Sequence, residues 1–113
     1  MAKIIRLPSA YVIDTKVVGV SKINDDGSSR QELIRKLIRE DDPIRLEPEP
    51  DNAYDPHAVR VLSNHGHQIG YLPRETAERV ASAIENEATI HCRVAWTGGE
   101  KFAGVGLRIE LEN

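Results

Sequence analysis

Cysteine, aromatic residues and long apolar runs are all scarce in this chain of 113 residues, and each shortage excludes a class of protein. The single cysteine, Cys92, cannot form an internal disulfide, which excludes a disulfide-stapled scaffold. No apolar run approaches the roughly 18–20 residues that span a membrane. Residues 1–8 also lack the long apolar core of a signal peptide. We therefore expect an intracellular, cytoplasmic protein without a membrane partner.

An excess of positive charge is missing as well. The formal net charge is −3, which argues against a protein that coats duplex DNA by neutralising its phosphates. Lys and Arg outnumber Asp and Glu in the first 45 residues, whereas acidic residues predominate in the remainder. An anionic ligand must therefore use a local patch, which suits a short ligand or a chain end better than a long duplex.

The length suits a single domain, residues 1–113, with one hydrophobic core. Two helices are predicted within it. Ser29 opens the first with the Ser-x-x-Glu pattern of a capping box, and apolar residues then recur at helical spacing as far as Ile38. Pro73 suits the first position of the second helix, whose apolar face continues to about Asn86.

Six strands are predicted around these helices, because runs rich in β-branched residues or with period-two alternation lie between turn-forming residues. The resulting order is β-α-β-β-β-α-β-β. Short strands joined by small turns favour a closed or nearly closed barrel, since closure removes exposed strand edges. The predicted fold is mainly β with two helices, in a small OB-like six-stranded antiparallel β-barrel. The predicted strands cover residues 11–20, 44–46, 57–62, 68–72, 89–96 and 105–111.

Metal-binding and nucleophilic side chains occur without the spacing of a known catalytic or metal site. The His-Gly-His run at 65–67 falls in a predicted hairpin turn, and zinc would need two further ligands. His91 and Cys92 are adjacent on a strand and therefore point to opposite faces. Gly104 and Gly106 lie in a strand rather than in a phosphate-binding loop. We predict no metal, no cofactor and no enzymatic activity.

One loop carries more chemistry than a connector requires. Residues 48–61 read Pro-Glu-Pro-Asp-Asn-Ala-Tyr-Asp-Pro-His-Ala-Val-Arg-Val. The prolines make a turn, and the side chains of Asn52 and Asp55 can close turns onto their own backbone. From composition alone, Tyr54 would be a half-buried aromatic that caps the end of the barrel. Arg74 follows at the start of the second helix, where dipole and guanidinium together can hold a phosphate.

This loop, together with Ile-Gly-Tyr-Leu-Pro-Arg at 69–74, resembles the signature of the HIRAN domain. That family shows an acidic-Pro-x-Asn-Pro-Tyr-Asp-x-Asn-Ala-Ile-x-Val run, followed by Ile/Val-Gly-(aromatic or His)-Leu/Val-Pro-(Arg/Lys). The resemblance covers roughly residues 11–112. It implies an OB-like β-barrel with two helices. It also implies a module that binds the 3′-hydroxyl end of single-stranded DNA in DNA repair and at stalled replication forks.

The resemblance also implies which residues hold the DNA. Asn52, Tyr54 and Asp55 match the binding loop of the family, and Tyr54 is expected to stack on a terminal base. Tyr71 and Arg74 match the positions that hold the strand end and its phosphate. A carboxylate such as Asp55 accepts a hydrogen bond from a free 3′-hydroxyl and repels a 3′-phosphate, so a net-negative domain can select a strand end.

Three further positions complete the comparison with the family. Phe102 matches a second aromatic near the pocket. Family members that bind DNA ends carry an Arg-aromatic pair where this chain has Ser21 and Lys22, and Lys22 offers a charge but no stacking plane or bidentate fork. Ala53 replaces the family proline, which leaves the loop less stiff. We therefore expect DNA binding that is weaker and less selective for ends.

The alternative prediction is a protein–protein adaptor that binds a partner, such as a repair protein. It would use the same groove or the basic helix 30–39. The cationic side chains of this helix lie largely off its apolar stripe, and we interpret them as a solvated face. They are Arg30, Arg35, Lys36 and Arg39.

Overall fold

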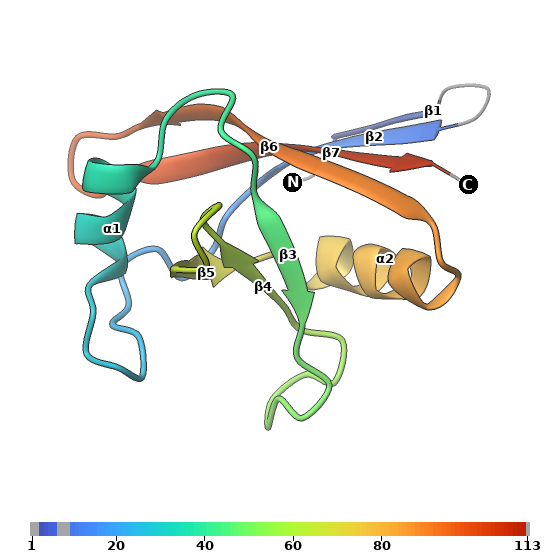
Figure 1. Cartoon of the computed structure of the whole chain (residues 1–113), viewed down its shortest axis with the longest axis horizontal. Coiled ribbons are helices and arrows are strands. Elements are labelled where there is room, and N and C mark those ends of the chain that lie inside the picture. Colours follow the sequence, from blue (N-terminus) through green and yellow to red (C-terminus); the bar gives the residue numbers. More distant parts are fainter. Residues whose placement is uncertain (1–2, 7–9, 113) are drawn as a thin grey trace.

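The structure is a computed structural model that describes residues 3–6 and 10–112. The predicted mainly β fold with two helices is confirmed, and β1 is a strand that the sequence did not predict. Within the described residues, no helix is long and apolar enough to cross a membrane. The elements are β1 (Lys3–Arg6), β2 (Ala10–Lys16), α1 (Arg30–Leu37), β3 (Arg45–Pro48), β4 (Val59–Leu62), β5 (Gln68–Tyr71), α2 (Arg74–Glu85), β6 (Thr89–Gly98) and β7 (Gly104–Glu112) (Figure 1).

The described strands form two antiparallel sheets rather than the predicted six-stranded barrel. One sheet has the order β1-β2-β7-β6 and the other the order β3-β4-β5. Figure 1 shows the larger sheet across the top, with β3–β5 and α2 below it. Among the described residues, the two sheets are connected by isolated bridges between Val18 and Tyr71 and between Pro43 and Arg93. The prediction of a closed barrel is therefore wrong, because single bridges replace continuous ladders and β1 adds a seventh strand at the edge of β2.

The space between the sheets and helices holds one hydrophobic core. Strand β7 contributes to it by the predicted alternation, and α2 contributes Ala77 and Val80. Each fully buried Val, Leu or Ile side chain contributes about 1.5–3 kcal/mol to folding, so this core holds the sheets together where their pairing is interrupted. The largest buried side chains include Ile13, Val17, Ile34, Val59, Val61, Ile69, Val94, Val105, Leu107 and Ile109.

Both helices begin close to where the sequence predicts. Ser29 is the N-cap of α1, and its hydroxyl accepts a hydrogen bond from the Glu32 amide at 3.2 Å, as a capping box requires. Ile38 is already extended and buried, so α1 ends at Leu37. Pro73 has an extended backbone, with ψ of 147°, and therefore precedes α2 as its N-cap instead of occupying its first position.

Candidate nucleic-acid interface

The loop between β3 and β4 is held by its own side chains. The Asn52 Oδ1 atom accepts hydrogen bonds from the amides of Tyr54 and Asp55, both at 2.9 Å. The Asp55 Oδ1 atom accepts one from the His57 amide at 2.9 Å. The predicted turn chemistry of Asn52 and Asp55 is therefore confirmed. These bonds give the loop a defined shape without a ligand.

Tyr54 lies at the tip of this loop and is 94% exposed. The prediction of a half-buried aromatic cap is wrong, because the loop turns the ring into solvent instead of over the core. An aromatic ring held out on an ordered loop loses the burial that usually stabilises it, a pattern typical of recognition surfaces. Its faces are available for stacking.

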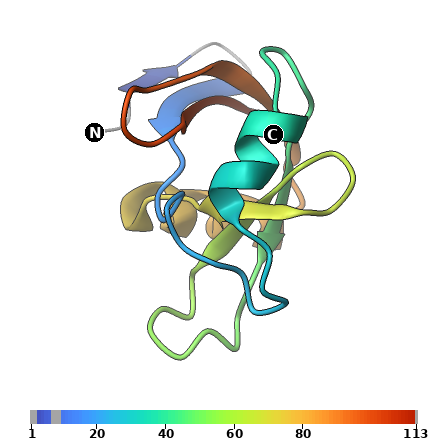
Figure 2. The ribbon, with the colours of Figure 1, turned by 90° about the vertical axis from the view of Figure 1, so that its left-hand side faces the viewer.

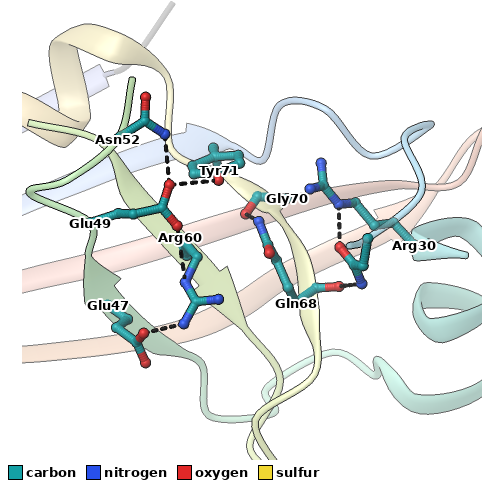
Figure 3. A network of polar contacts seen from close by, with 9 residues as sticks. Arg30, Glu47, Glu49, Asn52, Arg60, Gln68, Gly70 and Tyr71 are labelled. Atoms are coloured by element: carbon teal, nitrogen blue, oxygen red, sulfur yellow. Dashed lines mark hydrogen bonds and ion pairs between the residues drawn. The ribbon is translucent and has the colours of Figure 1, made fainter. Parts of the chain in front are cut away.

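A carboxylate beneath the loop connects it to β5. The Glu49 Oε1 atom accepts a hydrogen bond from Asn52 Nδ2 at 2.6 Å and another from the Tyr71 hydroxyl at 3.0 Å (Figure 3). The other carboxylate oxygen of Glu49 lies 3.5 Å from Arg60 Nε, and Arg60 also pairs with Glu47. Burial, together with the hydrogen bond to Glu49, raises the pKa of Tyr71, so its hydroxyl remains a donor at neutral pH.

Arg30 holds the ring of Tyr71 from its other side. Its guanidinium carbon lies 5.6 Å from the ring centroid, a cation–π distance. The same side chain donates to the Gly19 carbonyl at 2.9 Å and to Asn24 Oδ1 at 2.7 Å, and Asn24 in turn donates to the Gln68 carbonyl. Arg30 is only 8% exposed, so its assignment to a solvated basic face is wrong.

Glu49 and Arg30 are therefore two residues of the site that sequence reasoning missed. For Glu49, the sequence contains a usable signal. Glu47 and Glu49 are two positions apart, and the next predicted strand carries a cation, Arg60, with which such carboxylates can pair. The structure pairs Glu47 with Arg60 across β3 and β4. For Arg30 no comparable signal exists, because its side chain contacts Tyr71, a residue of β5 that lies 41 positions later in the sequence.

Asp55 and Arg74 lie together beside the exposed tyrosine. The Arg74 Nε atom is 4.0 Å from the Asp55 Oδ2 atom, and the Arg74 side chain is 82% exposed. A small cavity of about 150 Å³ lies between them and is also lined by His57 and Glu78. Such an exposed ion pair contributes about 0–1 kcal/mol, so the guanidinium can leave Asp55 for a phosphate at little cost.

Lys22 and Phe102 occupy two turns near α1. Gln31 joins these turns, since its Nε2 atom donates to the carbonyls of Val20 and Ala103 at 2.9 and 3.0 Å. Figures 1 and 2 both show the β6–β7 turn, which carries the half-exposed Phe102, well away from the β3–β4 loop. The structure thus brings together Asn52, Tyr54, Asp55, Tyr71 and Arg74, whereas the turns that carry Lys22 and Phe102 are joined through Gln31 at a second location.

Metal-binding side chains do not gather in the described part of the chain. Among residues 3–6 and 10–112, no three His, Cys, Asp or Glu side chains lie where they could hold one ion. Burial raises the pKa of the Cys92 thiol to about 12, which leaves it protonated and unreactive at neutral pH.

Comparison with protein families identifies one family to which both the fold and the loop at 48–61 correspond. The model of the HIRAN domain matches residues 11–112, nearly the whole chain. The chain belongs to the HIRAN family. This membership confirms the resemblance carried by the loop at 48–61 and by the run at 69–74.

This HIRAN domain is similar to a short part of much longer proteins. It is 33% identical over 51 residues to the helicase-like transcription factor of Oryctolagus cuniculus and to that of Mus musculus. The human protein of the same name is 29% identical over 51 residues. These matches cover 45% of this chain and 5% of each relative.

Two solved structures share the fold of this HIRAN domain. The crystal structure of the HIRAN domain of human HLTF has a TM-score of 0.70 at 21% identity, over 94% of this chain and 81% of that chain. A protein from Lactobacillus plantarum has a TM-score of 0.68 at 18% identity, over 99% and 98% of the two chains. At these identities the likeness supports the fold alone.

The glycine of the Ile-Gly-Tyr run, Gly70, allows this HIRAN domain to place Tyr71. A Cβ atom at Gly70 would overlap both the Val17 side chain and the Val18 carbonyl oxygen. Val18 and Tyr71 exchange two backbone hydrogen bonds, at 2.9 and 3.0 Å. Gly70 therefore permits the contact between β5 and the end of β2 on which the position of Tyr71 depends.

The variant Gly70→Ala should lower the free energy of unfolding by about 3 kcal/mol, because the new methyl group meets backbone that cannot move aside. Urea denaturation measures this change. Gly27→Ala is the control, since Gly27 has a φ of +87° with nothing within 4 Å, so that only backbone strain of about 1 kcal/mol is added. Equal losses in the two variants would show that the contact with Val18 is not tight.

Proposed function

We propose that this HIRAN domain is a non-enzymatic module that binds the 3′-hydroxyl end of single-stranded DNA. The observation that carries the proposal is Tyr54, 94% exposed on a loop that its own hydrogen bonds hold in place. Asp55 and Arg74 lie beside it as a weak ion pair. A nucleotide at a strand end offers a base, a 3′-hydroxyl and a phosphate, and these can be bound by an aromatic face, a carboxylate and an exposed cation respectively.

Each of these side chains has a role in the proposed complex. Tyr54 stacks on the terminal base, which contributes roughly 1–3 kcal/mol. The Asp55 Oδ2 atom, which faces Arg74 in the free protein, accepts a hydrogen bond from the 3′-hydroxyl and repels a 3′-phosphate. Arg74 turns from Asp55 to the phosphate that precedes the terminal sugar.

The network below the loop supports this role through Tyr71. Its ring lies under Arg30 and its hydroxyl reaches Glu49, so it is fixed before any ligand arrives. A site whose groups are already ordered loses less conformational entropy on binding. The net charge of −3 is compatible with this function, because a strand end needs few phosphate contacts.

The proposal is tested with two versions of one short oligonucleotide, labelled at the 5′ end. One version carries a free 3′-hydroxyl and the other a 3′-phosphate, and fluorescence anisotropy at low salt gives both affinities. Tighter binding of the 3′-hydroxyl strand is expected. Equal affinity for the two strands, or no binding to either, would overturn the proposal.

A role in DNA repair or at stalled replication forks is part of the same proposal. The relatives with matching segments bear the name helicase-like transcription factor, but this chain corresponds to only 5% of their length. The role in repair is therefore proposed from strand-end recognition and not from those relatives, because free 3′ ends arise inside the cell at damaged DNA and at stalled forks.

A second candidate function is a protein–protein adaptor that uses α1. The observation in its favour is Leu37, which is 41% exposed at the end of this helix beside exposed cations. Arg30 is buried and unavailable to such a partner, which leaves Arg35, Lys36 and Arg39. A partner protein whose binding is lost in Leu37→Glu and unaffected by competing oligonucleotide would favour this function.

A further inference from the structure

The only tryptophan of the chain, Trp96, lies flat on the backbone of β7. A Cβ atom at Gly106 would overlap the indole Nε1 atom, and one at Gly104 would lie 3.4 Å from two carbons of the six-membered ring. The two glycines are two positions apart and therefore share one face of the strand. Gly-x-Gly thus forms a flat seat for the indole that no residue with a side chain could provide.

A β-bulge turns Trp96 towards this seat. Val94 pairs with Leu107, yet the next pair is Trp96 with Gly106, so Ala95 is an extra residue in β6. Without the bulge, Ala95 would lie opposite Gly106 and Trp96 would point to the other face. Bulges often redirect a side chain beside a functional site, and here the bulge puts the indole on the outer face of the sheet.

The outward face of the indole is only partly covered. Trp96 is 44% exposed, and the Lys16 ammonium lies over its ring, with Nζ 6.0 Å from the ring centroid, a cation–π distance. Lys16 pairs with Gly106 on the neighbouring strand, so its flexible side chain reaches the ring across the glycine and can move aside for a base. A large aromatic that rests on backbone with one face, and meets a single exposed cation with the other, can serve as a stacking platform.

The platform forms part of a groove of about 1100 Å³ that extends to the first turn of α2. Its lining includes four cations, Lys16, Arg74, Arg93 and Arg108, against three carboxylates. Asp14 pairs with Arg108 at 3.2 Å. On a chain with a net charge of −3, this groove therefore carries a local excess of positive charge.

We propose that this groove binds an upstream nucleotide of the same single strand, with its base on Trp96 and its phosphates on the surrounding cations. The inference rests on the proposed function. Arg74 connects the two locations, because it lines both the small cavity beside Asp55 and the large groove. A strand whose 3′ end lies at Tyr54 would then pass Arg74 and reach the indole.

The chemistry of the groove favours a nucleic acid over a peptide. Recognition of proline-rich peptides uses several aromatic side chains that form parallel ridges, whereas this groove has one indole. A single stacking face bordered by cations is instead the combination that non-sequence-specific single-strand binding uses. Lys16 and Arg93 are exposed and able to contact phosphates on either side of the stacked base.

The test uses the intrinsic fluorescence of Trp96, which reports on this platform alone because the chain has one tryptophan. Thymidine strands of about two and about ten nucleotides, both with a free 3′-hydroxyl, are titrated into the protein at low salt. The long strand should quench the emission of Trp96 and bind more tightly. The dinucleotide should bind the loop, as followed by chemical shifts, without quenching.

Substitution of the indole provides the second measurement. Trp96→Leu should weaken binding of the long strand by roughly 5- to 150-fold, the loss of one stacked base, and leave binding of the dinucleotide unchanged. Trp96→Phe keeps an aromatic plane on the two glycines and should retain most of the affinity. Circular dichroism confirms that both variants are folded.

The outcomes separate this inference from the proposed function. Suppose that the protein binds both strands and prefers a 3′-hydroxyl to a 3′-phosphate, but that the long strand does not quench Trp96 and that Trp96→Leu binds it as tightly as the wild type. The platform is then overturned and end recognition stands. Quenching by the long strand without any preference for a 3′-hydroxyl would support the platform and overturn end recognition. No binding of either strand would overturn both.

Discussion

Replacing Tyr54 with alanine should weaken binding of a strand with a free 3′-hydroxyl by roughly 5- to 150-fold, which corresponds to about 1–3 kcal/mol of stacking on one base. The free energy of unfolding should change by less than about 0.5 kcal/mol, because the ring is 94% exposed and packs on nothing in the core. Fluorescence anisotropy measures the first quantity and urea denaturation the second.

Two further variants determine whether stacking causes the loss. Tyr54→Phe keeps the ring and should retain most of the affinity. Ile23→Ala removes an apolar side chain that is 61% exposed and belongs to neither proposed binding location, so it should bind like the wild type. Unchanged affinity in Tyr54→Ala would exclude the loop as the site of the terminal base.

Replacing Glu49 with alanine should lower both the stability of the domain and its affinity for DNA. The Asn52 amide and the Tyr71 hydroxyl would lose their shared acceptor, and Arg60 would lose one of its two carboxylates. Because the site is only partly buried, we expect a loss of about 1–3 kcal/mol in the free energy of unfolding. DNA affinity should fall as well, since Asn52 would no longer be tied to β3.

The adjacent carboxylate provides a matched control for this variant. Glu47 is more exposed than Glu49, and its ion pair within the described residues is with Arg60, so Glu47→Ala should cost about 0–1 kcal/mol and leave DNA binding intact. Hydrogen exchange gives a direct readout of the loop, because the amides of Tyr54 and Asp55 both donate to Asn52. If these amides stay equally protected in Glu49→Ala, Glu49 does not order the loop.

The sequence predicts the loop of this domain better than the placement of its side chains. Asn52 and Asp55 make the turns that their chemistry predicts, because these bonds are local and need no partner from elsewhere. Tyr54 was expected over the core and instead lies in solvent. Its placement depends on how the loop meets the body of the domain, which no local pattern contains.

Long-range pairings account for the other differences. Arg30 is buried because its guanidinium reaches Gly19 and the ring of Tyr71, contacts that helical periodicity cannot anticipate. In the described part of the chain the sheets meet at isolated bridges, which leaves the barrel open. Period-two alternation in the sequence predicts a strand but does not show how many residue pairs form where two sheets meet. β1 has only four residues and pairs along the edge of β2, which leaves little pattern to read.

The contact between Arg30 and Tyr71 has a consequence for regulation. Arg30 opens α1, the helix of the alternative protein-binding function, while Tyr71 belongs to the proposed DNA site. A protein that draws α1 away from the sheet would withdraw the guanidinium from the tyrosine ring and disorder the pocket. Thermodynamic linkage then requires that DNA at the pocket weaken the binding of that protein by the same factor. The two candidate functions would act as competing states of one molecule, with Arg30 as the coupling element.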